Sequence, residues 1–315
     1  MTQKENALRT IRFNNPERVM SWIPTHSLSY TGANNDGYDG SGEDCPVGTK
    51  WFDVWGVGWR KEQEGVMGFP FHHPLPDVVW PDPNDERICG KIYKLREAFQ
   101  GGDCFLCGSH RSTLWERSYK LAGMERMMTW LFERPDYARE ILRRIMDFQL
   151  GIAEHYLKCG VEMVSMGDDL GTQRSLLLGR NVLEEFFAPE YRRLFALYKQ
   201  HGVLVNFHSC GHVEPLIDMF VSLGVDVLNP VQATANDLSK FKGKICVHGG
   251  VSSAIIMDGR DIEATVKNTI GLFGKNGGYF CAPDQGMPYP EKHIAAFHAA
   301  VEKHGKNQHP QKPIS

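Results

Sequence analysis

The sequence predicts a (β/α)8 barrel, in which a ring of parallel strands is surrounded by helices. From Arg134 onward, short apolar runs alternate with amphipathic helical segments, as in consecutive βαβ units. Several apolar runs end in polar residues, which is where a barrel carries its chemistry. The sequence contains neither G-x-G-x-x-G nor a phosphate-binding P-loop. A barrel is therefore favoured over an open nucleotide-binding sheet.

The second half of the chain supplies most of the expected elements. Residues 135–158 have apolar side chains at helical spacing, and Gly160 follows as a helix-ending glycine. The expected helices are 135–158, 186–200, 213–223, 235–241, 262–273 and 291–304. The expected strands are 161–166, 203–207, 225–228, 244–247 and 279–282, with weaker candidates at 22–25 and 104–106. These strands approach eight, so we expect one barrel domain over residues 1–315.

Residues 30–85 differ from the rest of the chain. This segment is rich in glycine, proline, aspartate and aromatic residues, including Trp51, Trp55 and Trp59, and it has little periodicity. Long loop-rich inserts are usually functional or disordered, and so many tryptophans argue against disorder. We expect a loop-rich insert that caps the barrel mouth. The alternative is an aromatic layer that closes the bottom of the barrel.

Composition excludes several classes of protein. Lysine and arginine (35) nearly balance aspartate and glutamate (38), and no basic block suggests nucleic acid. No apolar run approaches the ~18 residues of a membrane span, and residues 1–7 lack the apolar core of a signal peptide. We therefore expect a cytoplasmic enzyme whose eight cysteines are thiols or metal ligands. Cys104 and Cys107 form a C-x-x-C pair that also fits a short buried strand.

The segment Val203–His212 carries the most informative motif. An apolar run ends in His208-Ser-Cys210, and residues two apart on a strand point the same way. Imidazole and thiolate suit zinc. The alternative is a buried cysteine beside a polar turn that caps the next helix, a role that His212 fits. A catalytic zinc needs three protein ligands, and Cys281, at the end of a later strand, would supply the third.

Other polar residues follow the predicted strands and would meet at the same face of a barrel. We expect Asp168, Asp169 and His248 to act in catalysis. Contacts to the substrate are expected from Asn229, Gln232, Trp55 and Trp59. Each strand-end group also has a plain interpretation as a cap or a turn residue. The convergence of several such groups is the stronger indication.

Several motifs together resemble the uroporphyrinogen decarboxylase superfamily. They are Phe13–Val19, Trp51–Trp59, Asp168–Gln173, Phe207–Gly211, Asp226–Gln232 and Gly277–Pro283. The resemblance covers nearly the whole chain. It implies a (β/α)8 barrel with its site at the C-terminal face of the strands.

The resemblance also separates two branches. The decarboxylases grip their substrate with an Arg-Gln-Ala-Gly-Arg-Tyr segment, and here Thr25–Tyr30 contains no arginine. The other branch contains corrinoid-dependent methyltransferases, including coenzyme M methyltransferases and methoxyl demethylases, whose zinc members use H-x-C and a distant cysteine. Their distal cysteine follows Ala-Pro, whereas Cys281 precedes Ala282-Pro283. Asp284 or Asp169 is therefore an alternative third ligand.

The resemblance therefore implies a zinc-dependent methyltransferase that exchanges a methyl group between a small substrate and the corrinoid (cobalamin) of a partner protein. The aromatic insert favours a methoxylated aromatic substrate, since its indole faces could stack on a ring. Three alternatives stay open at this point: a methylcobamide:thiol methyltransferase, a metal-free decarboxylase of a smaller acid, and a binding module without catalysis. The sequence is also compatible with a homodimer.

Overall fold

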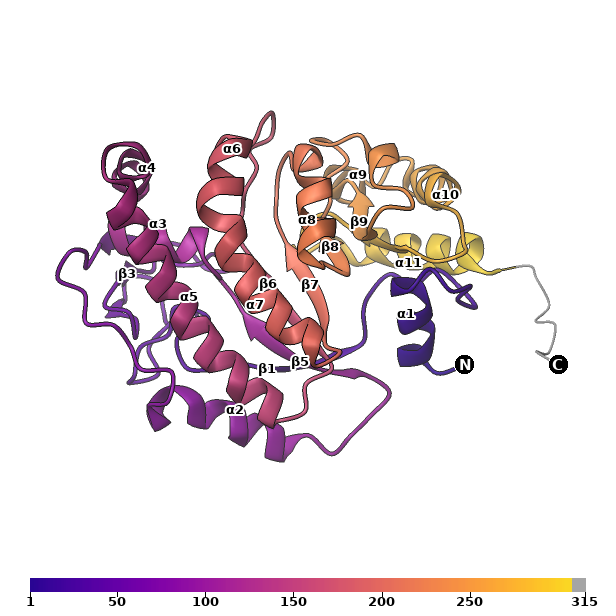
Figure 1. Cartoon of the computed structure of the whole chain (residues 1–315). Coiled ribbons are helices and arrows are strands. Elements are labelled where there is room, and N and C mark those ends of the chain that lie inside the picture. The colour runs from indigo at the N-terminus through magenta and orange to yellow at the C-terminus, as the bar shows by residue number, and fades with distance from the viewer. Residues whose placement is uncertain (308–315) are drawn as a thin grey trace.

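A curled sheet of seven parallel strands forms the centre of the molecule in the computed structural model, which describes residues 1–307 (Figure 1). The strand order is β1-β5-β6-β7-β8-β9-β10. Each strand therefore pairs with the strands that precede and follow it along the chain, apart from the three short strands of the insert. The strands are β1 Thr25–Leu28, β5 Phe105–His110, β6 Met163–Gly167, β7 Leu204–His208, β8 Val227–Asn229, β9 Cys246–Val251 and β10 Tyr279–Pro283. This is the predicted type of barrel, with seven paired strands in the described residues instead of eight.

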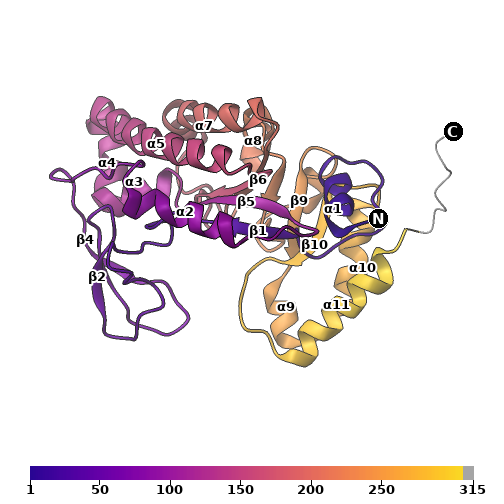
Figure 2. The same cartoon turned by 90° about the horizontal axis from the view of Figure 1, so that it is seen from below.

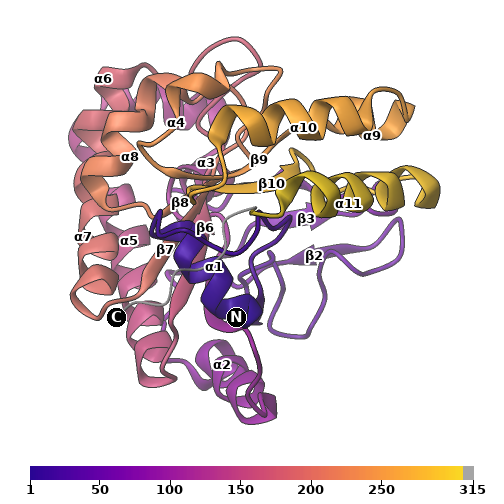
Figure 3. The same ribbon diagram turned by 90° about the vertical axis from the view of Figure 1, so that its right-hand side faces the viewer.

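Most helices cover the outside of the sheet, whereas α1 packs against the core inside its curl (Figures 1 and 3). The helices are α1 Gln3–Ile11, α2 Glu86–Ala98, α3 Trp115–Ala122, α4 Met124–Glu133, α5 Pro135–Lys158, α6 Arg180–Val182, α7 Ala188–Gln200, α8 Ile217–Leu223, α9 Ser253–Asp258, α10 Ile262–Phe273 and α11 Glu291–Gly305. Helices α5 and α10 have the predicted bounds. The prediction of a helix over 235–241 is wrong, since only a 3-10 turn forms in this segment, at Leu238–Lys240. Among residues 1–307, no helix has the length and apolarity to cross a membrane.

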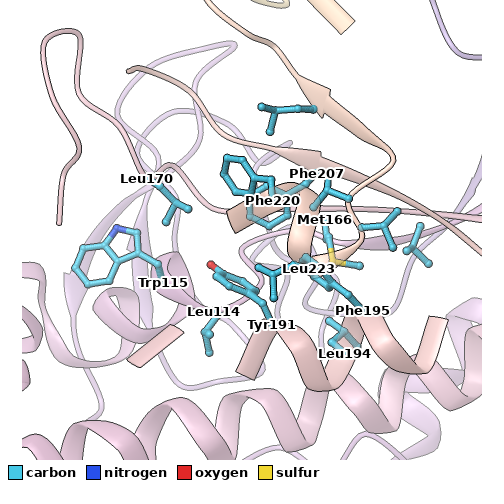
Figure 4. Close-up of a cluster of buried hydrophobic side chains, with 14 of the residues drawn as sticks. Leu114, Trp115, Met166, Leu170, Tyr191, Leu194, Phe195, Phe207, Phe220 and Leu223 are labelled. Atoms are coloured by element: carbon cyan, nitrogen blue, oxygen red, sulfur yellow. The ribbon is translucent and has the colours of Figure 1, made fainter. Parts of the chain in front are cut away.

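Alternate residues of each strand enter two separate cores, because successive side chains point to opposite faces of a sheet. One core, which we call the lumen core, lies inside the curl, and α1 contributes Ala7 and Ile11 to it. Its strand residues are Phe105, Cys107, Met163, Leu204, Val227, Cys246 and Phe280. The larger outer core lies between the sheet and the helices, and Figure 4 shows part of it, including Tyr191, Phe207 and Phe220.

The insert is more regular than the sequence suggests. It contains an antiparallel sheet of β2 Lys50–Phe52, β3 Gly58–Arg60 and β4 Phe69–His72 (Figure 2). Arg111, just after β5, ties the insert to the strand ends, since its Nη1 lies 3.3 Å from Glu43 Oε2. We expected the insert to cap the barrel mouth, but it leaves part of the mouth uncovered. The side chains of Asp169 and His208 at the ends of β6 and β7 are 46% and 43% exposed.

Candidate metal centre

Three potential metal ligands meet at the ends of β6 and β7. Donor atoms of Asp169, His208 and Cys210 all lie within 4.8 Å of one another. His208 Nε2 is 3.4 Å from Asp169 Oδ1 and 3.4 Å from Cys210 Sγ. The backbone N–H of Cys210 donates to Asp169 Oδ1 at 2.9 Å, which fixes the carboxylate beside the thiol. Nitrogen, oxygen and sulfur together form a donor set that suits zinc.

Two glycines allow the strand-end loops to meet. Gly211 has a φ of +81°, and a Cβ atom there would lie 2.4 Å from the backbone of Gly171. Any other residue would force the loops apart at the point where His212 N donates to Thr172 O at 2.7 Å. The close approach brings Asp169, on the first loop, to Cys210, on the second.

The electrostatics of the cluster favour a shared positive charge. Burial by itself would lower the pKa of His208, but its hydrogen bonds with Asp169 and Cys210 raise that pKa to about 10. Burial would raise the pKa of Asp169, and the hydrogen bonds from His208 and Cys210 outweigh it and lower that pKa. A cation held between these groups would take the place of the shared proton.

Asn229, at the end of β8, orients the histidine. Its Oδ1 lies 3.0 Å from His208 Nδ1, and its Nδ2 donates to Asn206 Oδ1 at 2.7 Å. Because an amide oxygen only accepts, the proton of a neutral His208 belongs on Nδ1. Nε2 is then free to bind a metal. Asn229 was predicted to bind substrate, and in this structure its amide supports a candidate ligand.

Cys281, the predicted third ligand, faces away from the cluster. It lies in β10 between Phe280, which points into the lumen core, and Ala282, so its own side chain enters the outer core. It is fully buried, and this burial raises the pKa of the thiol to about 12. Alternation along the strand explains the correction, since a residue one position from an inward-facing residue must face outward.

The position that follows β10 offers different groups. Asp284 is buried and accepts from the N–H and the hydroxyl of Ser253 at 2.9 and 2.7 Å, so it caps the start of α9. Gln285 lies nearer the cluster, because its Nε2 is 3.4 Å from Cys210 Sγ. Of the alternatives for the third ligand, only Asp169 lies among the clustered donors.

The adjacent residues Asp168 and Asp169 have different places. Asp168 is buried and accepts from the backbone N–H groups of Leu114 and Glu116 and from the Tyr191 hydroxyl. Burial raises the pKa of Asp168 to about 7. Its carboxylate therefore caps the first turn of α3 and does not reach the cluster, while its predicted part in catalysis stays a prediction.

Trp55 and Trp59 were predicted to contact the substrate, but both are buried, with exposed fractions of 0% and 1%. The ring of Trp55 packs 4.5 Å from that of Phe148, with the Arg117 guanidinium 4.9 Å from the indole. Trp59 Nε1 donates to Asp53 Oδ2 at 3.0 Å. These indoles hold the insert against α3 and α5, so their faces are not free to stack on a ligand.

The two other predicted site residues lie on the β8–β9 side of the cluster. Gln232 Oε1 accepts from the backbone N–H of Gly211 at 2.6 Å and so supports the loop that carries Cys210. His248 lies on β9 and faces the interior of the curl beside Phe280, with ring centroids 5.8 Å apart. Burial lowers the pKa of His248 to about 4, so it is neutral at pH 7.

Sequence reasoning missed two residues of this region. Asn206 precedes His208 by two positions, and a polar residue in phase with a ligand within an apolar strand is a signal that could have revealed it. Glu116 Oε1 accepts from the backbone N–H of Asp169 at 3.3 Å. Nothing in the local sequence of α3 indicates this contact.

The comparisons with known proteins bear on this geometry. The family model of uroporphyrinogen decarboxylase (URO-D) matches residues 88–304, which is more than half of the chain. The chain belongs to the uroporphyrinogen decarboxylase family. A search of curated proteins gave no match. The matched region of this family member includes Asp169, His208 and Cys210.

Two solved structures are similar to the chain to different degrees. This family member resembles a methyltransferase from Methanosarcina mazei at a TM-score of 0.71 and 15% identity, covering 96% of this chain and 99% of that one. A B12-independent methionine synthase from Shewanella sp. W3-18-1 matches at a TM-score of 0.42 and 10% identity, over 75% of this chain and 70% of that one. The first likeness extends over the whole barrel and supports the fold of this family member.

Proposed function

We propose that this protein is a zinc-dependent methyltransferase that exchanges a methyl group between a small substrate and the corrinoid of a partner protein. The observation that carries the proposal is the accessible cluster of Asp169, His208 and Cys210 at the C-terminal ends of β6 and β7. A whole-chain likeness to a methyltransferase agrees with it. Catalytic groups of barrel enzymes lie at this face.

The donor set fits zinc. A catalytic zinc has three protein ligands and one open position, and the cluster offers a carboxylate, an imidazole and a thiol. Asn229 holds His208 so that Nε2 faces the other two donors. Zinc bound there would supply a Lewis acid that polarises the heteroatom carrying the methyl group.

The residues of the chain then have separate tasks. Asp169, His208 and Cys210 hold the metal, Asn229 orients the imidazole, and Gln285 lies beside the thiol. In the transfer, the bond between heteroatom and methyl carbon breaks and its electron pair stays on the heteroatom. A reduced corrinoid on the partner protein would supply the electron pair for the new bond to carbon. The half-exposed side chains of Asp169 and His208 leave this face open to such a partner.

A methoxylated substrate remains the favoured donor, but for a different reason from stacking on tryptophan. The interior below the cluster is uncharged, which suits an ether better than a polyanionic acid. Residues 25–30, the place of the decarboxylases' arginine segment, contain no arginine, and this weighs against a tetrapyrrole acid as substrate.

Metal analysis of the purified protein tests the proposal. We expect about one zinc per chain, lost in His208→Ala and Cys210→Ser and retained in the matched control Cys281→Ser. Incubation with a methoxylated aromatic and a reduced corrinoid protein should give the absorbance of methylated cobalt. Full methyl transfer by metal-free protein would disprove the zinc mechanism, and the absence of transfer with zinc-loaded protein across a donor panel would disprove the donor role.

A further inference from the structure

A row of uncharged polar side chains lines the inside of the curl, just above the lumen core. Each lies two residues beyond a lumen-core residue on its strand, so each points the same way. The row consists of Ser109, Ser165, Asn206, Asn229 and His248, which we call the polar wall. The register places Ser165 beside both Ser109 and Asn206. His208 lies two residues beyond Asn206 on β7, toward the C-terminal end of the strand, and is paired with Asn229 on β8.

The polar wall faces an opening. All five side chains are partly exposed, whereas strand residues on the opposite face, such as Val164, Val205 and Phe207, are fully buried. His248 is accessible, yet loss of hydration is the main cause of its lowered pKa. The wall can therefore be reached by solvent although protein closely surrounds it.

The wall has unused hydrogen-bonding capacity. Asn206 Oδ1 accepts from Asn229, but within residues 1–307 the Nδ2 of Asn206 donates no hydrogen bond to the protein. The Ser165 hydroxyl likewise has no protein partner among the described residues. Donors and acceptors that face an opening without partners are what a polar ligand would meet.

The wall also lacks charge. It contains no acidic or basic residue, and the neutral imidazole of His248 adds none at pH 7. Charged groups stand at the rim instead, where Asp169 belongs to the cluster and Arg111 pairs with Glu43. A carboxylate held at the depth of the wall would lose water with no cation within hydrogen-bonding reach, because the cluster and Arg111 lie at the rim, and this costs several kcal/mol.

We propose that the polar wall binds the body of an uncharged methyl ether, through hydrogen bonds of its oxygen atoms to Ser165, Asn206 and His248. This inference rests on the proposed function. Two residues of strand separate Asn206 from His208, so the wall lies about 7 Å below the cluster, which is the depth of one aromatic ring. The methyl-bearing oxygen would then lie at the cluster and the methyl group would face the open mouth, where a corrinoid protein can reach it.

Binding of two matched probes tests the inference. Isothermal titration at pH 7 compares 4-methoxyphenol, which is neutral, with 4-methoxybenzoate, an anion of similar shape whose carboxylate would lie at the wall when the methoxy oxygen lies at the cluster. We expect the phenol to bind at least about tenfold more tightly, since burying the unpaired carboxylate costs more than one factor of ten. Ser165→Ala and His248→Gln should each weaken the phenol about three- to tenfold, consistent with one lost hydrogen bond. Ser222→Ala on exposed α8 is the matched control.

The outcomes separate this inference from the proposed function. Equal or tighter binding of the benzoate, no binding of either probe, or unchanged binding in both wall variants would overturn the inference. Zinc content and methyl transfer to cobalt are measured on the same preparations. A protein that holds zinc and transfers methyl but prefers the benzoate loses only the inference. A protein that binds the phenol through the wall but holds no zinc loses only the proposed zinc mechanism.

Discussion

Two cysteines at the ends of parallel strands, Cys210 and Cys281, have opposite environments. Cys210 follows β7 in phase with His208, and its thiol lies 3.4 Å from the imidazole at the open mouth. Cys281 lies within β10, is fully buried under the helices, and has its pKa raised to about 12 by that burial. The same side chain is thus a candidate ligand at one strand end and a packing residue at another.

The difference shows how strongly strand phase controls function in a barrel. A displacement of one residue moves a side chain from the interior to the helix-covered face. Asp168 and Asp169 show the same effect at the end of β6, because Asp168 caps α3 inside the protein and Asp169 belongs to the cluster. Proximity in sequence to a strand end is therefore a weaker predictor than the face on which a residue lies.

Replacing each of the two thiols with a hydroxyl should give the largest difference between the two positions. Cys210→Ser should weaken zinc binding more than about 100-fold, because removing a ligand should exceed the 10–100-fold loss typical of its supporting residues. Cys281→Ser should leave zinc affinity unchanged. Competition titration with a chromophoric chelator measures both, and an equal loss in the two variants would contradict the assignment.

Substitutions of Asp169 and Asp168 should also have different effects, one on zinc affinity and the other on stability. Asp169→Asn keeps an oxygen donor but removes its charge, so we expect zinc affinity to fall less than in Cys210→Ser, by about 10- to 100-fold. Asp168→Asn should keep zinc and lower the free energy of unfolding by about 1–3 kcal/mol, because its partners Leu114, Glu116 and Tyr191 lose a buried acceptor. Chelator titration and urea unfolding together distinguish the two. Zinc loss in Asp168→Asn alone would reverse the roles.

The hydrogen bond behind His208 should matter less than the ligands. Asn229→Leu removes the acceptor for His208 Nδ1 and should weaken zinc binding about tenfold, whereas Asn229→Asp keeps an acceptor and should restore much of it. In metal-free protein above about pH 10, where His208 is neutral, the ¹⁵N shifts of its ring report the tautomer, which should change only in Asn229→Leu. An unchanged tautomer in that variant would contradict the orienting role of Asn229.

The burial of Cys281 predicts a pH dependence. The thiol stays protonated in the folded protein to about pH 12, whereas the unfolded chain loses that proton near pH 9. The unfolded state therefore binds fewer protons, and between pH 9 and 12 this thiol makes stability fall by up to about 1.4 kcal/mol per pH unit. Cys281→Ala should flatten that part of the curve in urea unfolding from pH 8.5 to 10.5. Parallel curves for the two proteins would show that the thiol is not the source.

Much of the architecture follows from the sequence. Helices α5 and α10 and the strands of the second half have clear apolar periodicity, and Gly160 ends α5 as predicted. The insert was harder to predict, because β2, β3 and β4 are three or four residues long and depend on contacts of Trp51 and Trp59 with distant residues. Strands of three or four residues are too short for a period to be recognised.

The sequence by itself determined the parallel barrel and the pairing of His208 with Cys210, because both depend on local periodicity: alternation along a strand and the spacing of apolar residues on a helix. Only the tertiary structure decided the third donor, the burial of Trp55 and the orienting contact of Asn229. Those features depend on which strands are neighbours and on which face each residue occupies. Asp169 reaches Cys210 only because two loops 41 residues apart in sequence meet at Gly171 and Gly211.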